Sequence, residues 1–209
     1  MLIIFIGPPG SGKGTQSTLL LKNFRIPSVC MGDILRSKIE NDANLKQKMD
    51  SGSLLSSDYI NQIMADELKK LKLDQNIILD GYPRTIEQAL FLDENYHNIK
   101  KVALFFKSND QDLIDRLSNR FLCSDCKAVY NKKYNNTKLS GVCDNCGGTK
   151  FTQRADDQRD VIKNRLEQYR NSTEPLLEYY SKSNILNKVD CSRDFQDVFR
   201  DVCVAINLV

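Results

Sequence analysis

The sequence predicts an α/β fold, in which helices flank a five-stranded parallel sheet and two smaller lobes are inserted. Three observations predict this fold. Short apolar runs alternate with longer segments of helical periodicity, a pattern typical of βαβ units. A glycine-rich loop joins the first apolar run to the first helical segment. The polar stretch 121–153 interrupts the alternation and is too long for a plain connection in a compact domain.

The expected strands are short and mostly apolar, because parallel strands are covered on both faces. They span Leu2–Ile6, Ser28–Cys30, Ile77–Leu79, Val102–Phe106 and Ile185–Val189. The expected helices carry apolar residues three and four positions apart. They span Lys13–Phe24, Ile34–Ile39, Leu45–Met49, Asp58–Leu71, Thr85–Asp93, Asp110–Arg120, a segment from Val161 to Tyr169, and Phe195–Ile206.

The two interruptions of this pattern predict the inserted lobes. One lobe comprises residues 30–55, where two short helices precede the return to the sheet. The other comprises residues 120–156 and contains the polar stretch. The core domain is then expected to consist of residues 1–29, 56–119 and 157–209.

Composition excludes several classes of protein. Apolar residues make up 41% of the 209 residues and charged residues 27%, which excludes a disordered or fibrous chain. The net charge of +3 gives no sign of a nucleic-acid binder. No apolar run approaches the roughly 20 residues that span a bilayer. The opening run Met1–Ile6 is too short for a secretory signal and lacks its basic flank, so we expect a cytoplasmic protein with no membrane partner.

The first loop, Gly7–Thr15, reads GPPGSGKGT and matches the phosphate-binding pattern G-x-x-x-x-G-K. Glycines let successive backbone N–H groups approach phosphate oxygens without a Cβ in the way. The helix N-terminus behind the loop adds unpaired donors, and Lys13 adds a full positive charge for the β- and γ-phosphates. A chance glycine-rich turn is the alternative, but the strand–loop–helix context favours the phosphate site.

One position departs from the general phosphate-loop pattern. Gly14 replaces the hydroxyl residue that often ligates Mg²⁺ directly after the lysine, and Thr15 follows one position later. We therefore expect Mg²⁺ to be held more through water. Asp80 ends the apolar strand Ile77–Leu79, at the edge of a parallel sheet where ligands bind. Its carboxylate is a candidate for holding hydrated Mg²⁺, although an aspartate there also suits a turn.

Five arginines stand near the boundaries of the expected elements, and a guanidinium group grips phosphate with two hydrogen bonds. They are Arg36, Arg84, Arg120, Arg154 and Arg165. Each alone is most simply a solvated surface charge. Together they suit phosphoryl transfer, because that reaction spreads negative charge that must be neutralised. His97 is the single histidine and lies in a polar turn, so no Ser/His/Asp system for nucleophilic hydrolysis is expected.

Four of the seven cysteines form the pattern C-x₂-C-x₁₆-C-x₂-C, namely Cys123, Cys126, Cys143 and Cys146. This spacing predicts a closed tetrahedral Zn²⁺ site that staples a lobe with little core of its own. Iron would fit the same four thiolates, and disulfides are the weaker alternative in a cytoplasmic chain. Cys30, Cys191 and Cys203 are expected to be small buried hydrophobic residues.

Taken together, these motifs resemble the adenylate kinase family. Four segments carry the resemblance: Gly7–Gln16, Gly32–Arg36, Leu79–Thr85 with Gln88, and Gln153–Gln158 with Arg165. They match in order and spacing over essentially the whole chain. The four-cysteine insertion resembles the lid of the long, zinc-containing bacterial form.

The resemblance implies the P-loop nucleoside monophosphate kinase fold, with an AMP-binding lobe at 30–55 and a zinc-binding lid at 120–156. It implies reversible, Mg²⁺-dependent transfer of the terminal phosphoryl group of ATP to AMP, giving two ADP and serving adenine nucleotide homeostasis. ATP, AMP and ADP would be the substrates of a monomeric enzyme with no nucleic-acid partner. Lid closure would exclude water, which otherwise would accept the phosphoryl group.

By position, the resemblance also implies the site residues. ATP would be bound by Gly10, Ser11, Gly12, Lys13, Gly14, Thr15, Arg120, Val129, Tyr130 and Arg193. AMP would be bound by Met31, Arg36, Ser53, Leu54, Leu55, Gly81, Arg84, Gln88, Arg154 and Arg165, with Gln88 reading the adenine edge. The catalytic residues would be Lys13, Asp80, Arg84, Arg120, Arg154 and Arg165, and Asp156 and Asp157 would position the lid arginines.

Two positions depart from the family pattern. Met31 stands where the family usually has threonine, which removes one polar contact to AMP. Phe121 stands where a second arginine often follows Arg120, which reduces attraction for the donor phosphates.

Two alternative functions remain open at this point. A related kinase with a UMP or CMP acceptor, or with GTP as donor, would share most of these motifs, although Gln88 favours AMP. A zinc-ribbon NTPase that binds nucleic acid would explain the cysteines together with Lys127, Lys132, Lys133 and Lys138. Those lysines are more simply a solvated face, because Tyr130 and Tyr134 alone make a thin stacking platform.

Overall fold

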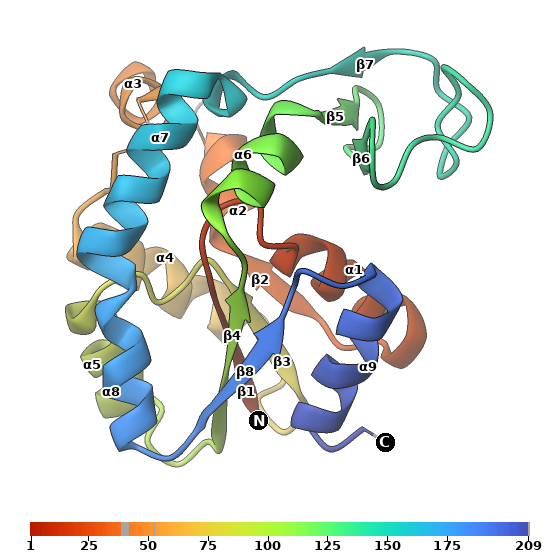
Figure 1. The fold of residues 1–209 in the computed structure, drawn as a ribbon. Helices are drawn as coiled ribbons and strands as arrows, with labels where there is room; N and C mark the ends of the chain where they lie inside the picture. The colour runs from red at the N-terminus through yellow and green to blue at the C-terminus, as the bar shows by residue number, and fades with distance from the viewer. Residues whose placement is uncertain (39–41, 52, 209) are drawn as a thin grey trace.

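A computed structural model gives the fold of the chain and describes residues 1–38, 42–51 and 53–208 (Figure 1). Its centre is a parallel five-stranded sheet in the order β2-β3-β1-β4-β8. The strands are β1 (Leu2–Ile6), β2 (Ser28–Cys30), β3 (Ile77–Asp80), β4 (Lys101–Lys107) and β8 (Leu186–Asp190). The predicted α/β class and the five predicted strands are confirmed. Their observed ends lie within one residue of the predicted ones.

Strand β1 lies in the middle of the sheet, and all five of its residues are buried. Ile4 is paired with Leu79 on one side and with Ala103 on the other. Successive side chains point to opposite faces, so Leu2, Ile4 and Ile6 join one core cluster, and Ile3 and Phe5 the other. The unbroken apolar run of the sequence thus contributes side chains to the core clusters on both faces of the sheet.

Helices cover both faces of the sheet (Figure 1). The cluster that contains Ile4 also contains residues of α4, α5 and α8, whereas the cluster that contains Phe5 contains residues of α1 and α9. The helices are α1 (Lys13–Phe24), α2 (Met31–Lys38), α3 (Ala43–Asp50), α4 (Ser57–Lys69), α5 (Ile86–Asn95), α6 (Asp110–Ser118), α7 (Arg159–Gln168), α8 (Pro175–Lys182) and α9 (Phe195–Ala205). Among the described residues, none of the helices is long and apolar enough to cross a membrane.

Several predicted helix boundaries were wrong. Helix α6 ends at Ser118, and Arg120 instead begins the strand β5. Helix α2 begins at Met31, three residues before the predicted start, and the predicted end at Ile39 lies outside the described residues. The sequence interpretation also missed α8, which follows a short π-helix at Tyr169–Thr173.

The polar stretch forms a small antiparallel sheet in the order β6-β5-β7. Its strands are β5 (Arg120–Cys123), β6 (Val129–Asn131) and β7 (Phe151–Thr152). In Figure 1 this sheet projects beyond the carboxyl ends of the central strands. The sequence predicted an insertion here but not its strands, because segments of two to four residues show no readable period. We call residues 120–156 the lid; these bounds, and those of the 30–55 lobe and the core, stay a prediction.

Candidate functional site

The loop after β1 has the geometry of an anion cradle. Gly10 and Gly12 have φ angles of 86° and 96°, which side chains of L-residues rarely tolerate. Gly7 packs so tightly that a Cβ there would lie 2.9 Å from the carbonyl oxygen of Phe106. Helix α1 begins directly at Lys13, and Gly12 has no side chain with which to cap it. The first-turn N–H groups of α1 can therefore serve an anion.

Lys13 is folded back into this loop. Its ammonium group donates hydrogen bonds to the carbonyl oxygens of Gly7 (2.7 Å) and Pro8 (2.9 Å), and to the Ser11 hydroxyl (3.3 Å). Burial lowers the pKa of Lys13 to about 8, although the carboxylate of Asp80 opposes the shift. The charge is thus held in place at the site where phosphate oxygens can replace the carbonyls as its partners.

Asp80 ends β3 beside the phosphate loop, and its side chain is buried. Burial raises the pKa of the Asp80 carboxyl, while the cations of Lys13 and Arg84 oppose the rise. A Cβ on Gly14 would lie 3.8 Å from the Asp80 Oδ2 atom, so the start of α1 and the end of β3 meet there. A carboxylate oxygen and the nearby phosphate loop are the donor set that suits Mg²⁺ held with nucleotide phosphates.

The turn after β3 presents Arg84 to solvent and fixes its backbone. The Arg84 N–H donates to the Gln88 Oε1 atom (2.7 Å), and the Arg84 Nε atom donates to the Gly81 carbonyl (3.1 Å). Gln88 itself is buried in the first turn of α5, which Thr85 caps. The predicted residues Gly81, Arg84 and Gln88 therefore lie together in one hydrogen-bonded turn.

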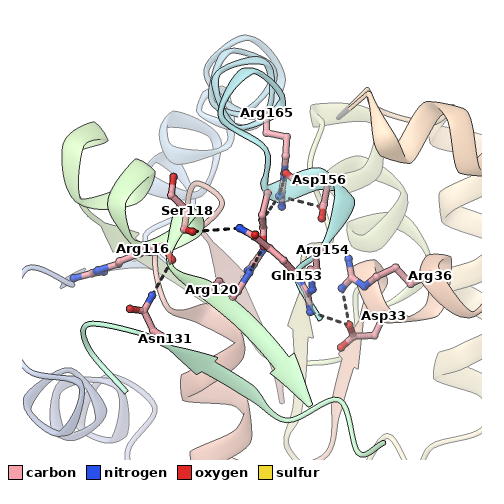
Figure 2. Close-up of polar contacts among 11 residues, drawn as sticks. Asp33, Arg36, Arg116, Ser118, Arg120, Asn131, Gln153, Arg154, Asp156 and Arg165 are labelled. Atoms are coloured by element: carbon pink, nitrogen blue, oxygen red, sulfur yellow. Dashed lines mark hydrogen bonds and ion pairs between the residues drawn. The ribbon is translucent and has the colours of Figure 1, made fainter. Parts of the chain in front are cut away.

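Arg36 and Arg154 converge on one carboxylate, that of Asp33 (Figure 2). The Arg36 Nη2 atom lies 2.6 Å from the Asp33 Oδ1 atom, and the Arg154 Nη2 atom lies 3.7 Å from it. Burial, with the cations of Arg120 and Arg36, lowers the pKa of Arg154 to about 10. Asp33 thus joins the lobe at 30–55 to the end of the lid.

A second carboxylate, that of Asp157, binds both Arg120 and Arg165. Arg120 donates to both oxygens of Asp157, from Nε at 2.7 Å and from Nη2 at 2.5 Å. The Arg165 Nη1 atom lies 3.2 Å from the Asp157 Oδ1 atom and 3.0 Å from the Asp156 Oδ2 atom. The Asp157 side chain is fully buried. All five predicted arginines are thus held by carboxylates or backbone in neighbouring segments.

The remaining predicted site residues make contacts of their own. The Tyr130 ring lies inside the lid, stacked 5.6 Å from Phe121, with its hydroxyl 3.2 Å from the Cys143 sulfur. Met31 is buried in the core, which fits an apolar residue at that position. Arg193 is paired with Asp201 on α9, and Val129 is exposed. Ser53 is exposed, whereas Leu54 and Leu55 are half-buried, and Leu55 packs against the core.

The four cysteines of the lid come together as predicted. Their sulfur atoms all lie within 4.8 Å of one another. The Cys123 and Cys146 sulfurs are 3.6 Å apart, and those of Cys126 and Cys143 are 3.5 Å apart. Zn–S bonds of about 2.3 Å in a tetrahedron place sulfur atoms roughly 3.8 Å apart, so the four thiols fit such an ion. Cys191 and Cys203 are buried and Cys30 is half-buried, close to the expectation for the remaining three.

Both cysteine pairs have the same backbone turn. Lys127 N–H donates to the Cys123 carbonyl (3.0 Å), and Gly147 N–H donates to the Cys143 carbonyl (2.8 Å). Lys127 and Gly147 both have positive φ angles, 61° and 75°. Each turn brings its two sulfurs to the same side, so the sequence spacing leads directly to the cluster.

The sequence interpretation missed the residues that attach neighbouring segments to the site. Gln16 donates to the Phe195 carbonyl (3.0 Å) and Arg116 to the Cys191 carbonyl (2.6 Å), which fixes both ends of the loop before α9. Near the C-terminal end of α6, the lid residues Asn131 and Gln153 donate to the carbonyls of Arg116 and Ser118 (Figure 2). Such contacts join residues far apart in sequence, so no local signal reveals them.

Comparison with known proteins agrees with this geometry. A family model described as "Adenylate kinase" matches residues 5–185. The chain is 43% identical over 206 residues to an adenylate kinase of Orientia tsutsugamushi (strain Boryong), covering 97% of each chain. It is 41% identical over 210 residues to an adenylate kinase of Methanosarcina barkeri, covering 97% of this chain and 96% of the other. An adenylate kinase of Caldanaerobacter subterraneus is 37% identical over 214 residues, covering 99% and 96%.

Proposed function

This chain belongs to the adenylate kinase family and is an ATP:AMP phosphotransferase, and from that premise we propose which of its residues perform each part of the reaction. The enzyme transfers the terminal phosphoryl group of ATP reversibly to AMP, giving two ADP, and uses Mg²⁺ with ATP. The observation that carries the assignment of roles is that Lys13, Asp80 and Arg84 interact electrostatically at the carboxyl ends of β1 and β3.

The donor site is the loop Gly7–Thr15. Backbone N–H groups of Gly10 to Thr15 bind the donor phosphates, and the Lys13 ammonium exchanges its carbonyl partners for phosphate oxygens. This exchange costs little, because the charge is already desolvated and oriented by the loop carbonyls. Val129, with the backbone of Tyr130, and Arg193 flank the donor nucleotide.

The acceptor site lies between the 30–55 lobe and the turn after β3. Arg84 and Arg36 bind the AMP phosphate, and the backbone of Gly81 and of Ser53–Leu55 lines the site. Gln88 reads the adenine edge; its Oε1 atom accepts from the Arg84 N–H, so its amide nitrogen is the group that would bind the acceptor base. One buried amide thus links recognition of the base to placement of the phosphate-binding arginine.

Two arginines of the lid and one of α7 supply the charge that the transferring phosphoryl group needs. Arg120, Arg154 and Arg165 neutralise the equatorial oxygens in an in-line transfer. Asp157 and Asp156 hold Arg120 and Arg165 in fixed directions before substrates bind, so the cost of arranging the charges is met during folding. Closure of the lid keeps water from accepting the phosphoryl group.

Mg²⁺ supplies charge neutralisation between the donor phosphates. Asp80, through water, and Thr15 are the residues that would hold it. In the lid, the four cysteines would hold Zn²⁺ as a structural ion. Their number leaves no open coordination position, so the ion stabilises the lid and takes no part in the transfer.

The decisive experiment is ADP formation from ATP plus AMP, measured on one preparation together with its metal content. We expect turnover with AMP to exceed that with UMP, CMP or GMP by at least 100-fold, because Gln88 and the buried site reject the wrong base edge. Lys13→Ala should abolish transfer and leave the fold intact by circular dichroism. A folded Lys13→Ala variant with near-normal turnover would overturn the donor-site assignment.

Two accompanying properties stay predictions. We propose a cytoplasmic location and a monomeric state, which size-exclusion chromatography with light scattering and cell fractionation would test. The nucleic-acid alternative predicts salt-sensitive binding to DNA or RNA, which a filter-binding assay measures.

A further inference from the structure

The helix that carries Arg165 is interrupted at a defined place. Helix α7 passes through the π-helix Tyr169–Thr173 and continues as α8, so the three segments form one long, almost continuous rod (Figure 1). The Glu174 N–H donates to the Tyr169 carbonyl at 2.9 Å, which is the five-residue spacing of a π-turn. Pro175 follows at once and has no N–H to continue the α-helical ladder. The proline explains why the helix widens there.

The π-turn sets the direction of Thr173. One inserted residue rotates the following side chains by about 100° relative to an uninterrupted α-helix. In this orientation Thr173 is buried, and its hydroxyl donates to the Arg84 carbonyl at 3.0 Å. Short π-turns inside α-helices are frequent at functional sites, where they aim a side chain that the regular helix would misdirect.

Arg84 is therefore held at both ends of its backbone. Gln88 accepts from its N–H, and Thr173 donates to its carbonyl. These two contacts come from different elements, since Gln88 lies in α5 and Thr173 lies between α7 and α8. Rotation of the Arg84 backbone would break one of them. The side chain thus starts from a fixed Cα position and direction.

We propose that Thr173 is a positioning residue for Arg84, and that the π-turn exists to place it there. The hydroxyl joins the acceptor-side arginine to the same helical rod that carries Arg165, eight residues before Thr173. Movement of the rod is then transmitted to both arginines together. This inference rests on the proposed role of Arg84 in binding the AMP phosphate.

The test compares Thr173→Val with Thr173→Ser. Valine keeps the volume and removes the donor, whereas serine restores a donor of the same geometry. Loss of one hydrogen bond that orients a ligand-binding side chain predicts a roughly 5- to 10-fold weaker Kd for AMP, measured by calorimetry without ATP. The KM for ATP should change less than 2-fold, and Thr173→Ser should restore the AMP affinity to within about 2-fold.

A matched control is Ser172→Ala, which removes a hydroxyl from the adjacent residue of the same π-helix. It should leave the AMP affinity unchanged. Thermal unfolding of all variants checks the fold, because a merely structural role would lower stability and impair the two substrates alike. Equal losses for ATP and AMP in Thr173→Val, no loss at all, or failure of serine to restore affinity would each overturn the proposal.

A second background separates this inference from the function on which it rests. Arg84→Lys should weaken AMP binding by itself, since lysine cannot grip phosphate with two parallel hydrogen bonds. Adding Thr173→Val to Arg84→Lys should then reduce the AMP affinity by a smaller factor than Thr173→Val does in the unaltered enzyme. Two changes that act through one contact are not additive. An unchanged AMP affinity in Arg84→Lys would refute the proposed role of Arg84. If Arg84→Lys weakened AMP binding as expected but Thr173→Val alone had no effect, only the role of Thr173 would be refuted.

Discussion

Arg120 and Asp157 are joined by two hydrogen bonds, of 2.7 Å and 2.5 Å, between a lid arginine and a fully buried carboxylate 37 residues later in the chain. Arg120 is the first residue of the lid, in β5, and Asp157 directly follows its last residue, in the turn before α7. Asp157 also contacts Arg165, so one negative charge holds two positive ones. The pair closes the base of the lid and sets the direction of both guanidinium groups.

The first prediction concerns Asp157→Asn. The amide keeps the shape but loses the charge that balances two partly buried guanidinium groups. The free energy of unfolding should therefore fall by on the order of 3 kcal/mol. We expect kcat to fall by about 10- to 100-fold, because the arginines lose their direction before substrate binds. Asp156→Asn is the matched control: its carboxylate is less buried and pairs with one arginine, Arg165, among the described residues, so its effect should be smaller. Chemical denaturation and steady-state kinetics measure both quantities, and equal effects of the two variants would contradict this view of the lid base.

The second prediction follows from the lowered pKa of Lys13, about 8. The ratio kcat/KM for ATP reports on the free enzyme. This ratio should be constant up to about pH 8. Above that pH it should decrease, with a limiting slope of tenfold per pH unit, as the lysine loses its charge. The same lowered pKa has the opposite effect on the stability of the fold. The unfolded chain keeps the proton to higher pH than the folded one, so this group adds stability above pH 8.

Loss of activity above pH 8 should therefore occur without unfolding, which parallel thermal melts across the pH range would verify. Lys13→Arg is the control variant, because arginine stays charged. Its activity is expected to be lower, but its profile should lack the decline that begins near pH 8. If the profile of the unaltered enzyme stayed level to pH 9.5, the buried environment of Lys13 would not control donor binding.

The third prediction concerns the metal. The native protein should contain one metal ion per chain, and mass spectrometry of the metal distinguishes zinc from iron. Cys143→Ser combined with Cys146→Ser should abolish metal binding. Since a structural zinc site supplies about 10 kcal/mol or more of folding energy, the lid should then lose its structure. Limited proteolysis should accordingly cut within residues 120–156 and leave the rest of the chain intact.

The matched control for the metal is Cys203→Ala, which removes a buried cysteine on α9 outside the cluster. It should leave the metal content and the cleavage pattern of the lid unchanged. A native protein that carries no metal, or a double variant in which the lid resists proteolysis as well as the native one, would refute the structural site.

The fourth prediction contrasts two glycines of the phosphate loop. A Cβ on Gly10 would lie 2.9 Å from the Leu117 Cγ atom and 3.1 Å from the Leu113 carbonyl, whereas a Cβ on Gly12 would meet nothing within 4 Å. Both have positive φ, which costs alanine about 1–2 kcal/mol. Gly10→Ala should therefore lose more stability than Gly12→Ala, because it also collides with α6. Gly12→Ala should mainly raise the KM for ATP, since its Cβ would project into open space of the anion cradle.

Thermal unfolding and the KM for ATP, measured on both glycine variants, check this contrast. The expected order of stability is native, then Gly12→Ala, then Gly10→Ala. If Gly12→Ala proved the less stable of the two, the packing of the loop against Leu113 and Leu117 would not control its conformation.

Local signals were sufficient for much of this protein. The run Leu2–Ile6 predicted a buried strand because all of its residues are apolar, and GPPGSGKGT predicted the cradle because only glycine adopts the φ angles found at Gly10 and Gly12. The spacing of Cys123, Cys126, Cys143 and Cys146 predicted the cluster, since a two-residue gap is what one knuckle turn requires. The strand, the loop and each cysteine pair are complete within a few residues of sequence.

Tertiary structure decided the rest. Tyr130 turns into the lid towards Cys143, and Asp33 gathers Arg36 and Arg154 from segments more than a hundred residues apart. Thr173 reaches Arg84 because Pro175 breaks the helical ladder and the resulting π-turn rotates the side chain. The sequence by itself determined which chemical groups are available and which short turns hold them. Only the packing of distant elements determined which charges meet, because the direction of a side chain depends on the partners that the whole fold brings to it.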